Sequence, residues 1–268
     1  MAESNPVHFF DIPSTLPGSS KSWSPNTLKV RTVLNFKNIP YTQSWISYPD
    51  IKPFTQGLGL EANPTGYKWT LPAIIHDSVT SNPNGAMMDS LPIVQHLDKV
   101  FPEPPLFPSG DASYALLLAV QRLTIGLGPA IRSIIIPTVP EYLDPRGQEY
   151  FVRTRSESFG KPLAEVRPTD PAEIQELWES VEKSSGPLLD VLKGREGKKG
   201  PFFEGEKAGC VDLFFVSTLA FLHRFAPDLW EKFMAFGDGE FRVLWNVCSP
   251  WLEGQGEEKE WPVPQVDA

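Results

Sequence analysis

Four prolines fall within the seven residues from Pro102 to Pro108, and they divide the chain into two parts of different character. Because proline fixes its own backbone angle and removes a hydrogen-bond donor, such a run predicts a linker between domains. We place the first domain at residues 1–104 and the second at residues 109–268. The chain has 268 residues, enough for two domains that each bury a core.

The first part opens with a predicted strand–helix–strand unit. Residues 6–13 form a short apolar run that ends at a proline, as expected of a buried strand. Ser24 and Pro25 then provide an N-cap and a first helical residue, and residues 41–47 are rich in strand formers. Units of this kind make parallel strand pairs with a right-handed crossover.

A long stretch, residues 48–70, separates this unit from the next elements. It exceeds an ordinary connection, so we expect it to be functional or to hold a short helix. Residues 71–77 predict a third strand, and Asn84-Gly85 marks a turn into a fourth, antiparallel strand at residues 86–88. A helix then begins near residue 90, which completes the order β-α-β-(irregular)-β-β-α.

The part after the linker predicts only helices. A first helical segment, residues 111–136, should bend near Gly126, Gly128 and Pro129. Further helices are expected at 145–166, 170–193, 209–225 and 228–236, and the tryptophan-containing tail should pack along the surface. The fold class is therefore α/β plus all-α.

Composition excludes several classes of function. The formal net charge is −9 and no Lys/Arg-rich block occurs, which argues against nucleic acid and against an anionic membrane as partners. The apolar runs are too short to span a bilayer, and the N-terminus lacks a secretory pattern. The two cysteines lie among apolar residues, as expected of buried thiols, and the four histidines are too scattered to predict a metal site. We expect a cytoplasmic protein without a metal.

Ser24 is the first candidate for chemistry. A helix N-terminus favours an anion, and a serine hydroxyl there could donate a hydrogen bond to a sulfur and favour its thiolate. The ordinary alternative is that Ser24 is only an N-cap. Ser22 is a neighbouring candidate, but Ser24 directly precedes the proline.

Two further motifs adjoin predicted elements. Leu71–Pro72 stands where the third strand begins, and its ordinary interpretation is a strand-initial proline. Asp89-Ser90 stands where a helix begins, and its ordinary interpretation is a helix cap.

These motifs and the order of elements, over nearly the whole chain, resemble a glutathione transferase. The resemblance implies a thioredoxin-like first domain that binds glutathione as co-substrate and an all-helical second domain that contributes a hydrophobic substrate pocket. It implies a catalytic Ser24, and a cis peptide bond before Pro72 so that the backbone of Leu71 pairs with the cysteinyl part. It further implies that Ser90 holds the γ-glutamyl carboxylate and that Asp89 orients the glutamyl amine. The family usually has glutamate at position 89, so the shorter Asp89 is a departure.

Some features narrow the resemblance, and others leave choices open. Trp23-Ser24-Pro25, the stretch 45–51 and the proline-rich linker look closest to the fungal, etherase-related class of serine type. The glycyl carboxylate of glutathione needs a cation, for which Lys52 and Lys68 are equal candidates; both are also ordinary solvated lysines.

Speculative walls of the hydrophobic pocket are Phe10, Trp23, Tyr48 and Leu127. Gly209 and Asp212 match a helix-opening motif in which the family has serine or threonine at the position of Gly209.

The resemblance implies a detoxification enzyme in which the glutathione thiolate attacks an apolar, aromatic electrophile or a peroxide. Aryl-ether cleavage is also open as a side activity. The main alternative is a ligandin-like carrier of aromatic or polyphenolic compounds on the same fold. A scaffold role ranks last because such domains usually carry further domains or polar tails. A cysteine-dependent thiol transferase is disfavoured because no cysteine lies near residue 24. A twofold homodimer is expected from the family.

Overall fold

The computed structural model describes residues 6–263, and the chain divides into two compact units. The first unit comprises Met1–Pro104, Leu143–Tyr150 and Trp251–Ala268; the second comprises Pro105–Tyr142 and Phe151–Pro250. The break after Pro104 lies within the predicted linker. The sequence predicts a second domain at 109–268, but two segments of that range, 143–150 and 251–268, belong to the first unit. Within the first unit, Arg146 of segment 143–150 donates two hydrogen bonds to Asp50, at 2.9 and 2.6 Å.

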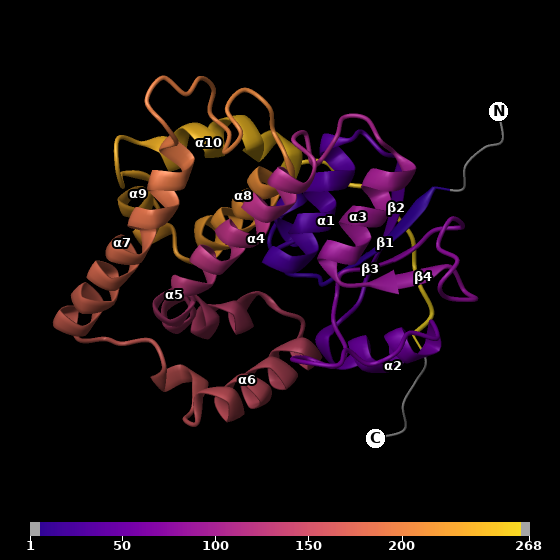
Figure 1. Cartoon of the computed structure of the whole chain (residues 1–268). Coiled ribbons are helices and arrows are strands. Elements are labelled where there is room, and N and C mark those ends of the chain that lie inside the picture. Colours follow the sequence, from indigo (N-terminus) through magenta and orange to yellow (C-terminus); the bar gives the residue numbers. More distant parts are fainter. Residues whose placement is uncertain (1–5, 264–268) are drawn as a thin grey trace. The chain divides into compact units, whose positions relative to one another are not determined.

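The first unit is a mixed sheet with helices on both faces (Figure 1). The strand order is β4-β3-β1-β2-β5, with β1 parallel to β2, β2 parallel to β5, and β3 antiparallel to both β1 and β4. Its strands are β1 (Val7–Asp11), β2 (Tyr41–Trp45), β3 (Ala73–Ile75), β4 (Ala86–Met88) and β5 (Glu257–Glu258). Its helices are α1 (Pro25–Phe36), α2 (Ile51–Gly57) and α3 (Ser90–Val100), with short 3-10 turns at Gly18–Lys21 and Tyr48–Asp50. The predicted order is confirmed, including a short helix in the irregular stretch.

Alternation along β1 explains why helices lie on both sides of this sheet. Successive side chains of a strand point to opposite faces. The ring of Phe9 lies 5.2 Å from the guanidinium of Arg31 in α1, whereas the ring of Phe10 lies 4.5 Å from that of Phe54 in α2. Both phenylalanines are fully buried. Phe10 is thus a core residue of the sheet, which does not support its prediction as a pocket wall.

The fifth strand is absent from the sequence-based expectation. Residues Glu257–Glu258 add to the sheet beside β2, with Thr42 opposite Glu257 and Gln43 opposite Glu258. The Lys259 amide then donates to the Gln43 carbonyl at 2.8 Å. The tail does lie along a surface, as predicted, but it does so as part of the first unit's sheet.

The second unit is helical (Figure 1). Helices α4 and α5 are separated at Leu127 and, with the turn that follows, form a pair bent by 58°, which confirms the predicted bend. The helices are α4 (Asp111–Gly126), α5 (Gly128–Ile135), α6 (Pro145–Phe159, its first turns belonging to the first unit), α7 (Pro171–Lys193), α8 (Cys210–Phe225), α9 (Pro227–Met234) and α10 (Glu240–Cys248). Short 3-10 segments are Ile136–Tyr142, Leu163–Glu165 and Ser249–Leu252.

Helix α8 is the core of this unit, and Asp212 fastens its beginning. The Asp212 carboxylate accepts hydrogen bonds from the backbone amides of Gly209 at 2.8 Å and Phe203 at 2.9 Å. Burial raises the pKa of Asp212 to about 7, although these amides oppose the rise. Gly209 has no side chain to return a bond, so the motif keeps only the half supplied by Asp212, as expected from the sequence.

The stability of the first unit depends on the protonation state of His8. Its ring nitrogens bond the hydroxyls of Thr42 at 2.5 Å and Ser44 at 2.9 Å. The Ser44 hydroxyl donates to the Lys259 carbonyl, so the ring Nε2 donates to Ser44. The Nδ1 atom of a neutral ring can then accept from the Thr42 hydroxyl. Burial, with a smaller effect of Lys259, lowers the pKa of His8 from 6.5 to about 4.

We therefore expect the free energy of unfolding to decrease as the pH falls from 6.5 toward about 4. Within this range His8 is protonated in the unfolded chain but still neutral in the folded protein. Urea unfolding across this pH range measures the slope. In His8→Gln the slope should be smaller by up to about one bound proton. Identical slopes in the two proteins would contradict the assignment.

Candidate functional site

A pocket of about 340 Å³ in the first unit brings together three segments far apart in sequence. Its lining consists of Asn26 in the first turn of α1, Thr70–Pro72 before β3, and Asp89–Pro92 at the start of α3. This volume lies at the lower end of the range for small-molecule sites. Four of the predicted site residues, Leu71, Pro72, Asp89 and Ser90, therefore share one pocket.

Two helix N-termini meet at this pocket. Asn26 is the second residue of α1, and Ser90 is the first residue of α3. The first amides of a helix have no partner within the helix and carry a partial positive charge, so each start favours an anion. The arrangement can hold carboxylate or thiolate groups although the chain as a whole has a net charge of −9.

The segment before β3 has the conformation implied by the resemblance. The Leu71–Pro72 peptide bond is cis. The carbonyl of Pro72 accepts a hydrogen bond from the Asp89 amide at 3.2 Å. This bond ties the start of β3 to the start of α3, and both segments line the pocket.

Asp89 has an unusual backbone conformation that its surroundings hold in place. Its φ is +75°, a region that residues other than glycine rarely adopt. Its carboxylate accepts from the Thr70 hydroxyl at 2.9 Å and from the Asn63 amide at 3.3 Å. Strained residues that several partners fix in this way are often found at binding sites. The shorter side chain is therefore anchored at the pocket rather than directed to solvent.

Ser24 stands at the N-cap of α1, as predicted. Its carbonyl accepts from the Leu28 amide at 2.9 Å and from the Thr27 hydroxyl at 3.1 Å, which starts the helix. Within residues 6–263 its hydroxyl makes no capping bond to the backbone of α1. Ser24 is buried, with 6% of the residue exposed, and it is not among the lining residues named above. Ser24 thus lies two residues before a lining residue, with its hydroxyl unused by the helix.

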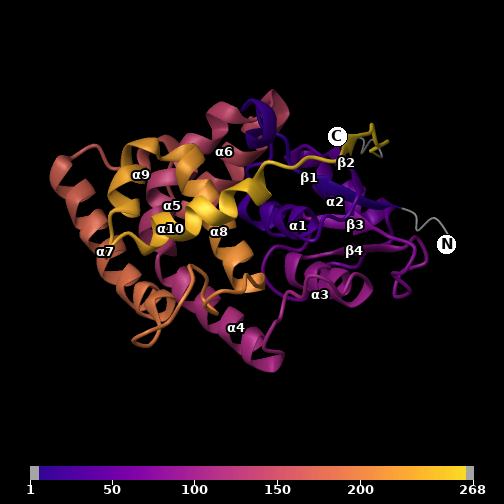
Figure 2. The ribbon, with the colours of Figure 1, turned by 90° about the horizontal axis from the view of Figure 1, so that it is seen from above.

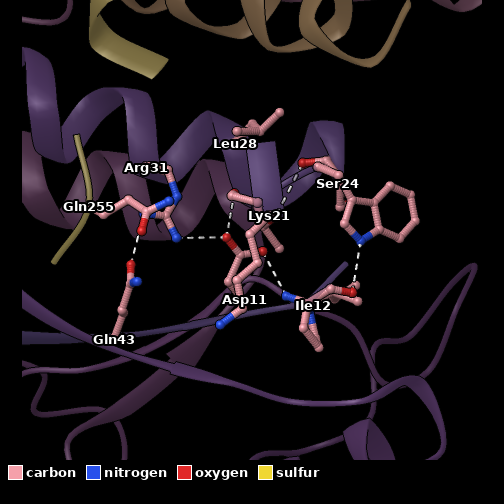
Figure 3. Close-up of polar contacts among 12 residues, drawn as sticks. Asp11, Ile12, Lys21, Ser24, Leu28, Arg31, Gln43 and Gln255 are labelled. Atoms are coloured by element: carbon pink, nitrogen blue, oxygen red, sulfur yellow. Dashed lines mark hydrogen bonds and ion pairs between the residues drawn. The ribbon is translucent and has the colours of Figure 1, made fainter. Parts of the chain in front are cut away.

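The Ser22 hydroxyl is already used inside the first unit, which argues against Ser22 as the alternative. It is fully buried and donates to Asp11 Oδ2 at 2.5 Å. The same oxygen accepts from Arg31 Nη2 at 2.9 Å, and Arg31 Nη1 donates to Gln43 Oε1 at 2.8 Å. Figure 3 shows Asp11 and Arg31 pointing toward one another beneath α1, with Ser24 at the start of that helix. This buried network fixes the loop that leads into Ser24.

The two lysines differ in their surroundings. Lys68 is exposed, and its ammonium donates to the carbonyls of Asn63 and Pro64 at 3.2 Å each. Lys52 is exposed on α2. Within the described residues neither lysine lines the pocket, so their role toward a glycyl carboxylate stays a prediction.

The remaining predicted wall residues fall into different places. Leu127 is buried between α4 and α5 in the second unit. Trp23 is buried, with its indole donating to the Pro13 carbonyl at 3.3 Å. The ring of Tyr48 lies 6.1 Å from that of Trp23 and stacks at 6.0 Å on that of Tyr150. Trp23 and Tyr48 therefore form an aromatic cluster, which Tyr150 joins.

The pocket lining also contains residues that the sequence analysis did not name as site residues, namely Asn26, Thr70, Leu91 and Pro92. Tyr150 of the aromatic cluster was not named either. Asn26 follows the Ser24-Pro25 start, so its position in the first turn was a usable signal. Thr70 supports Asp89 from a residue nineteen positions away, and Tyr150 comes from the segment that the linker had assigned to the second domain. Neither the contact of Thr70 with Asp89 nor the place of Tyr150 in the first unit is indicated by a pattern of neighbouring residues.

Residues 6–263 contain no group of three or more histidine, cysteine or acidic side chains arranged to hold a metal ion. In the same range no single helix has the length and apolar character needed to cross a membrane; only the bent pair that begins with α4 meets those criteria jointly.

Two family models and a curated relative match the chain. Residues 20–105 match the family model for the N-terminal domain of glutathione S-transferases, and residues 115–251 match that for the C-terminal domain. The chain is 54% identical to a glutathione S-transferase-like protein, ustS, of Aspergillus flavus, over 98% of this chain and 97% of the relative.

Solved structures give the same result. A glutathione S-transferase of Ceriporiopsis subvermispora in complex with glutathione is 31% identical, with a TM-score of 0.80 over 92% of this chain and 98% of that one. The glutathione transferase GSTFuA3 of Phanerochaete chrysosporium is 29% identical, with a TM-score of 0.80 over 93% of this chain and 98% of that one.

Proposed function

Because the chain belongs to the glutathione S-transferase family, we propose that it binds glutathione in the pocket of the first unit and activates its thiol with Ser24. The observation that carries this proposal is the meeting of Asn26, Leu71–Pro72 and Asp89-Ser90 in one pocket at two helix N-termini. Glutathione is the co-substrate that neighbouring structures contain. The thiolate would attack an apolar, aromatic electrophile or a peroxide.

The glutamyl end of glutathione fits the start of α3. Its carboxylate would accept from the Ser90 hydroxyl and from the first amides of α3, which point toward the pocket end of the helix. Its ammonium would lie near Asp89, whose carboxylate already has one oxygen anchored by Thr70 and Asn63. The cysteinyl backbone would pair with Leu71, and Lys52 or Lys68 would meet the glycyl carboxylate.

The thiol end is then directed toward the start of α1. A thiol has an ordinary pKa of about 8.5, so it is mostly protonated at neutral pH. A hydrogen bond from Ser24 and the positive end of α1 both favour the thiolate. The thiol proton passes to bulk water when the thiolate forms. In conjugation the sulfur then forms a bond to the electrophilic carbon while the leaving group departs with its electron pair. Ser24 forms no covalent bond; it stabilises charge on the sulfur.

A carrier function is the second proposal, supported by the aromatic cluster of Trp23, Tyr48 and Tyr150. Aromatic side chains suit an apolar ligand with few polar groups. Tight binding of a polyphenol without any turnover of a generic electrophile would favour the carrier. Turnover of the electrophile would favour the enzyme. Peroxidase and ether-cleaving activity, the twofold dimer and the cytoplasmic location stay predictions.

Replacing Ser90 by alanine tests the binding half of the proposal. We expect the dissociation constant for glutathione to rise by roughly tenfold or more, because a hydrogen bond to a charged group is lost. The turnover number at saturating glutathione should change little, since the sulfur end is untouched. Isothermal titration calorimetry and steady-state kinetics measure the two quantities.

Ser133→Ala is the matched control, because that exposed hydroxyl bonds only the Pro129 carbonyl of its own helix among the bonds described. Wild-type affinity in Ser90→Ala would place the glutamyl carboxylate elsewhere. Failure of the wild-type protein to bind glutathione at all would overturn the proposed function.

A further inference from the structure

The residues after α10 form a strap across the first unit, which we define as Trp251–Trp261, the C-terminal strap. In the view from above it runs as a yellow segment beside α1 toward β2 (Figure 2). It begins at the end of α1, where the Trp251 ring lies 4.9 Å from that of Phe36. It ends over β1, where the Trp261 ring lies 4.8 Å from that of His8 and 4.9 Å from that of Phe10.

Between these ends the strap contacts the loop that carries Ser24, which we define as the Ser24 loop, residues 13–24. The Ser19 hydroxyl donates to the Glu253 carboxylate. The Gln255 amide donates to the Gly18 carbonyl at 2.8 Å. The Lys21 ammonium lies 3.3 Å from the Glu258 carboxylate. Three side chains of the strap thus bind three successive parts of this loop.

A second, buried connection runs from the strap through Arg31. The Gly254 carbonyl accepts from Arg31 Nη1 at 3.4 Å and from the Asn35 side-chain amide at 3.1 Å. Arg31 in turn binds Asp11, and Asp11 accepts from Ser22, two residues before Ser24. Figure 3 shows the thin strap segment passing beside Arg31 at Gln255. The strap therefore touches the Ser24 loop directly and also through the network beneath it.

Two glycines of the strap are required for this close fit. A Cβ atom on Gly254 would lie 2.5 Å from Asn35 Oδ1, and one on Gly256 would lie 2.5 Å from the Tyr41 carbonyl oxygen. Contacts this short do not occur for real side chains, and the Tyr41 oxygen is backbone that cannot move aside cheaply. The strap is thus seated against α1 and β2 with no room for larger residues at these two positions.

We propose that the C-terminal strap is a positioning element for Ser24. When it is seated it orders the Ser24 loop, and this order places the Ser24 hydroxyl at the glutathione sulfur. Glu253, Gln255 and Glu258 are the positioning residues, acting on Ser19, Gly18 and Lys21. The effect of the strap on catalysis rests on the proposed function. Its ordering of the Ser24 loop does not, because that is a claim about structure alone.

The test is the triple variant Glu253→Ala, Gln255→Ala, Glu258→Ala in the full chain. These side chains are exposed, so the fold and the seat of Gly254 should persist. We expect faster amide hydrogen exchange in residues 14–22, a higher pKa of bound glutathione thiol by its ultraviolet absorbance, and a fall in turnover number between about tenfold and a hundredfold. Glutathione affinity should stay within about twofold, because the Ser90 end is unchanged.

Gly256→Val is the second variant, and it should unseat the strap from Tyr41 and give the same changes or larger ones. Glu231→Ala is the matched control; that exposed carboxylate pairs with Arg242 in the second unit and should leave every readout unchanged. Unchanged hydrogen exchange in the Ser24 loop of both strap variants would overturn the inference whatever the function. Faster exchange with an unchanged thiol pKa and turnover would overturn it as well.

Ser24→Ala, measured in parallel, separates the two claims. If Ser24→Ala lowers turnover and the strap variants do not, the strap inference fails alone. If Ser24→Ala has no effect, the proposed function fails, and the catalytic role of the strap fails with it. The exchange measurement then still reports whether the strap orders the loop.

Discussion

Replacing Ser24 by alanine should lower the turnover number for glutathione conjugation by about a hundredfold, the effect of removing one donor to a developing or stable anion in a catalytic site. The dissociation constant for glutathione should change little, because the glutamyl and cysteinyl contacts lie at Ser90 and Leu71. The pKa of the bound thiol should rise toward its ordinary value of about 8.5. Steady-state kinetics with a generic electrophile, calorimetry and ultraviolet titration of the thiolate measure these three quantities.

Two companion variants make the Ser24 experiment decisive. Ser24→Thr keeps a hydroxyl at the N-cap and should recover much of the turnover. Asn26→Ala removes the side chain that lines the pocket from the same helix turn. If turnover is unchanged in Ser24→Ala and falls in Asn26→Ala, the donor to the sulfur is Asn26 and the assigned role of Ser24 is wrong.

Replacing Asp11 by alanine should lower the free energy of unfolding by about 3–5 kcal/mol, the usual cost of removing one partner of a buried ion pair. Asp11 and Arg31 are fully buried at 2.9 Å, so the variant leaves an uncompensated guanidinium inside the first unit. It also leaves the Ser22 hydroxyl without the carboxylate to which it donates. Urea unfolding at neutral pH measures the change.

Asp50→Ala is the matched control, because its partner Arg146 is 67% exposed in its side chain and such pairs contribute at most about 1 kcal/mol. Adding Arg31→Met to Asp11→Ala should recover part of the lost stability, since the unpaired charge is then gone. Strict additivity of the two substitutions would mean that the charges do not interact, and it would refute the proposed role of the pair.

The parts of the fold that could be predicted from the sequence are those that depend only on adjacent residues. The Ser24-Pro25 helix start, the Asp170-Pro171 start of α7 and the Asn84-Gly85 turn each depend on a few neighbouring residues. In α7 the Asp170 carboxylate accepts from the Ala172 amide at 2.8 Å, two residues along the chain. Contacts of this kind involve only neighbouring residues, so they can be predicted from the sequence.

The candidate site could be predicted only in part. Leu71, Pro72, Asp89 and Ser90 were found through the family resemblance, and the pocket brings them together. The preference for Ser24 over Ser22 came from its place directly before Pro25, and the bond from Ser22 to Asp11 adds a reason that the sequence does not contain. The burial of Phe10 does not support its prediction as a wall, and alternation along β1 does not by itself say that helices cover both faces of the strand.

By itself the sequence determined the order of elements and the division near the proline-rich linker, because these follow from local propensity and periodicity. Its motifs, in their order, carried the resemblance to the family. Only the tertiary structure decided that the C-terminal strap joins the sheet as β5 and that Arg31 links Asp11 to Gly254. Residues 31 and 254 are 223 positions apart, and Thr42 lies opposite Glu257. Such pairings arise from the packing of the whole first unit, and no local pattern encodes them.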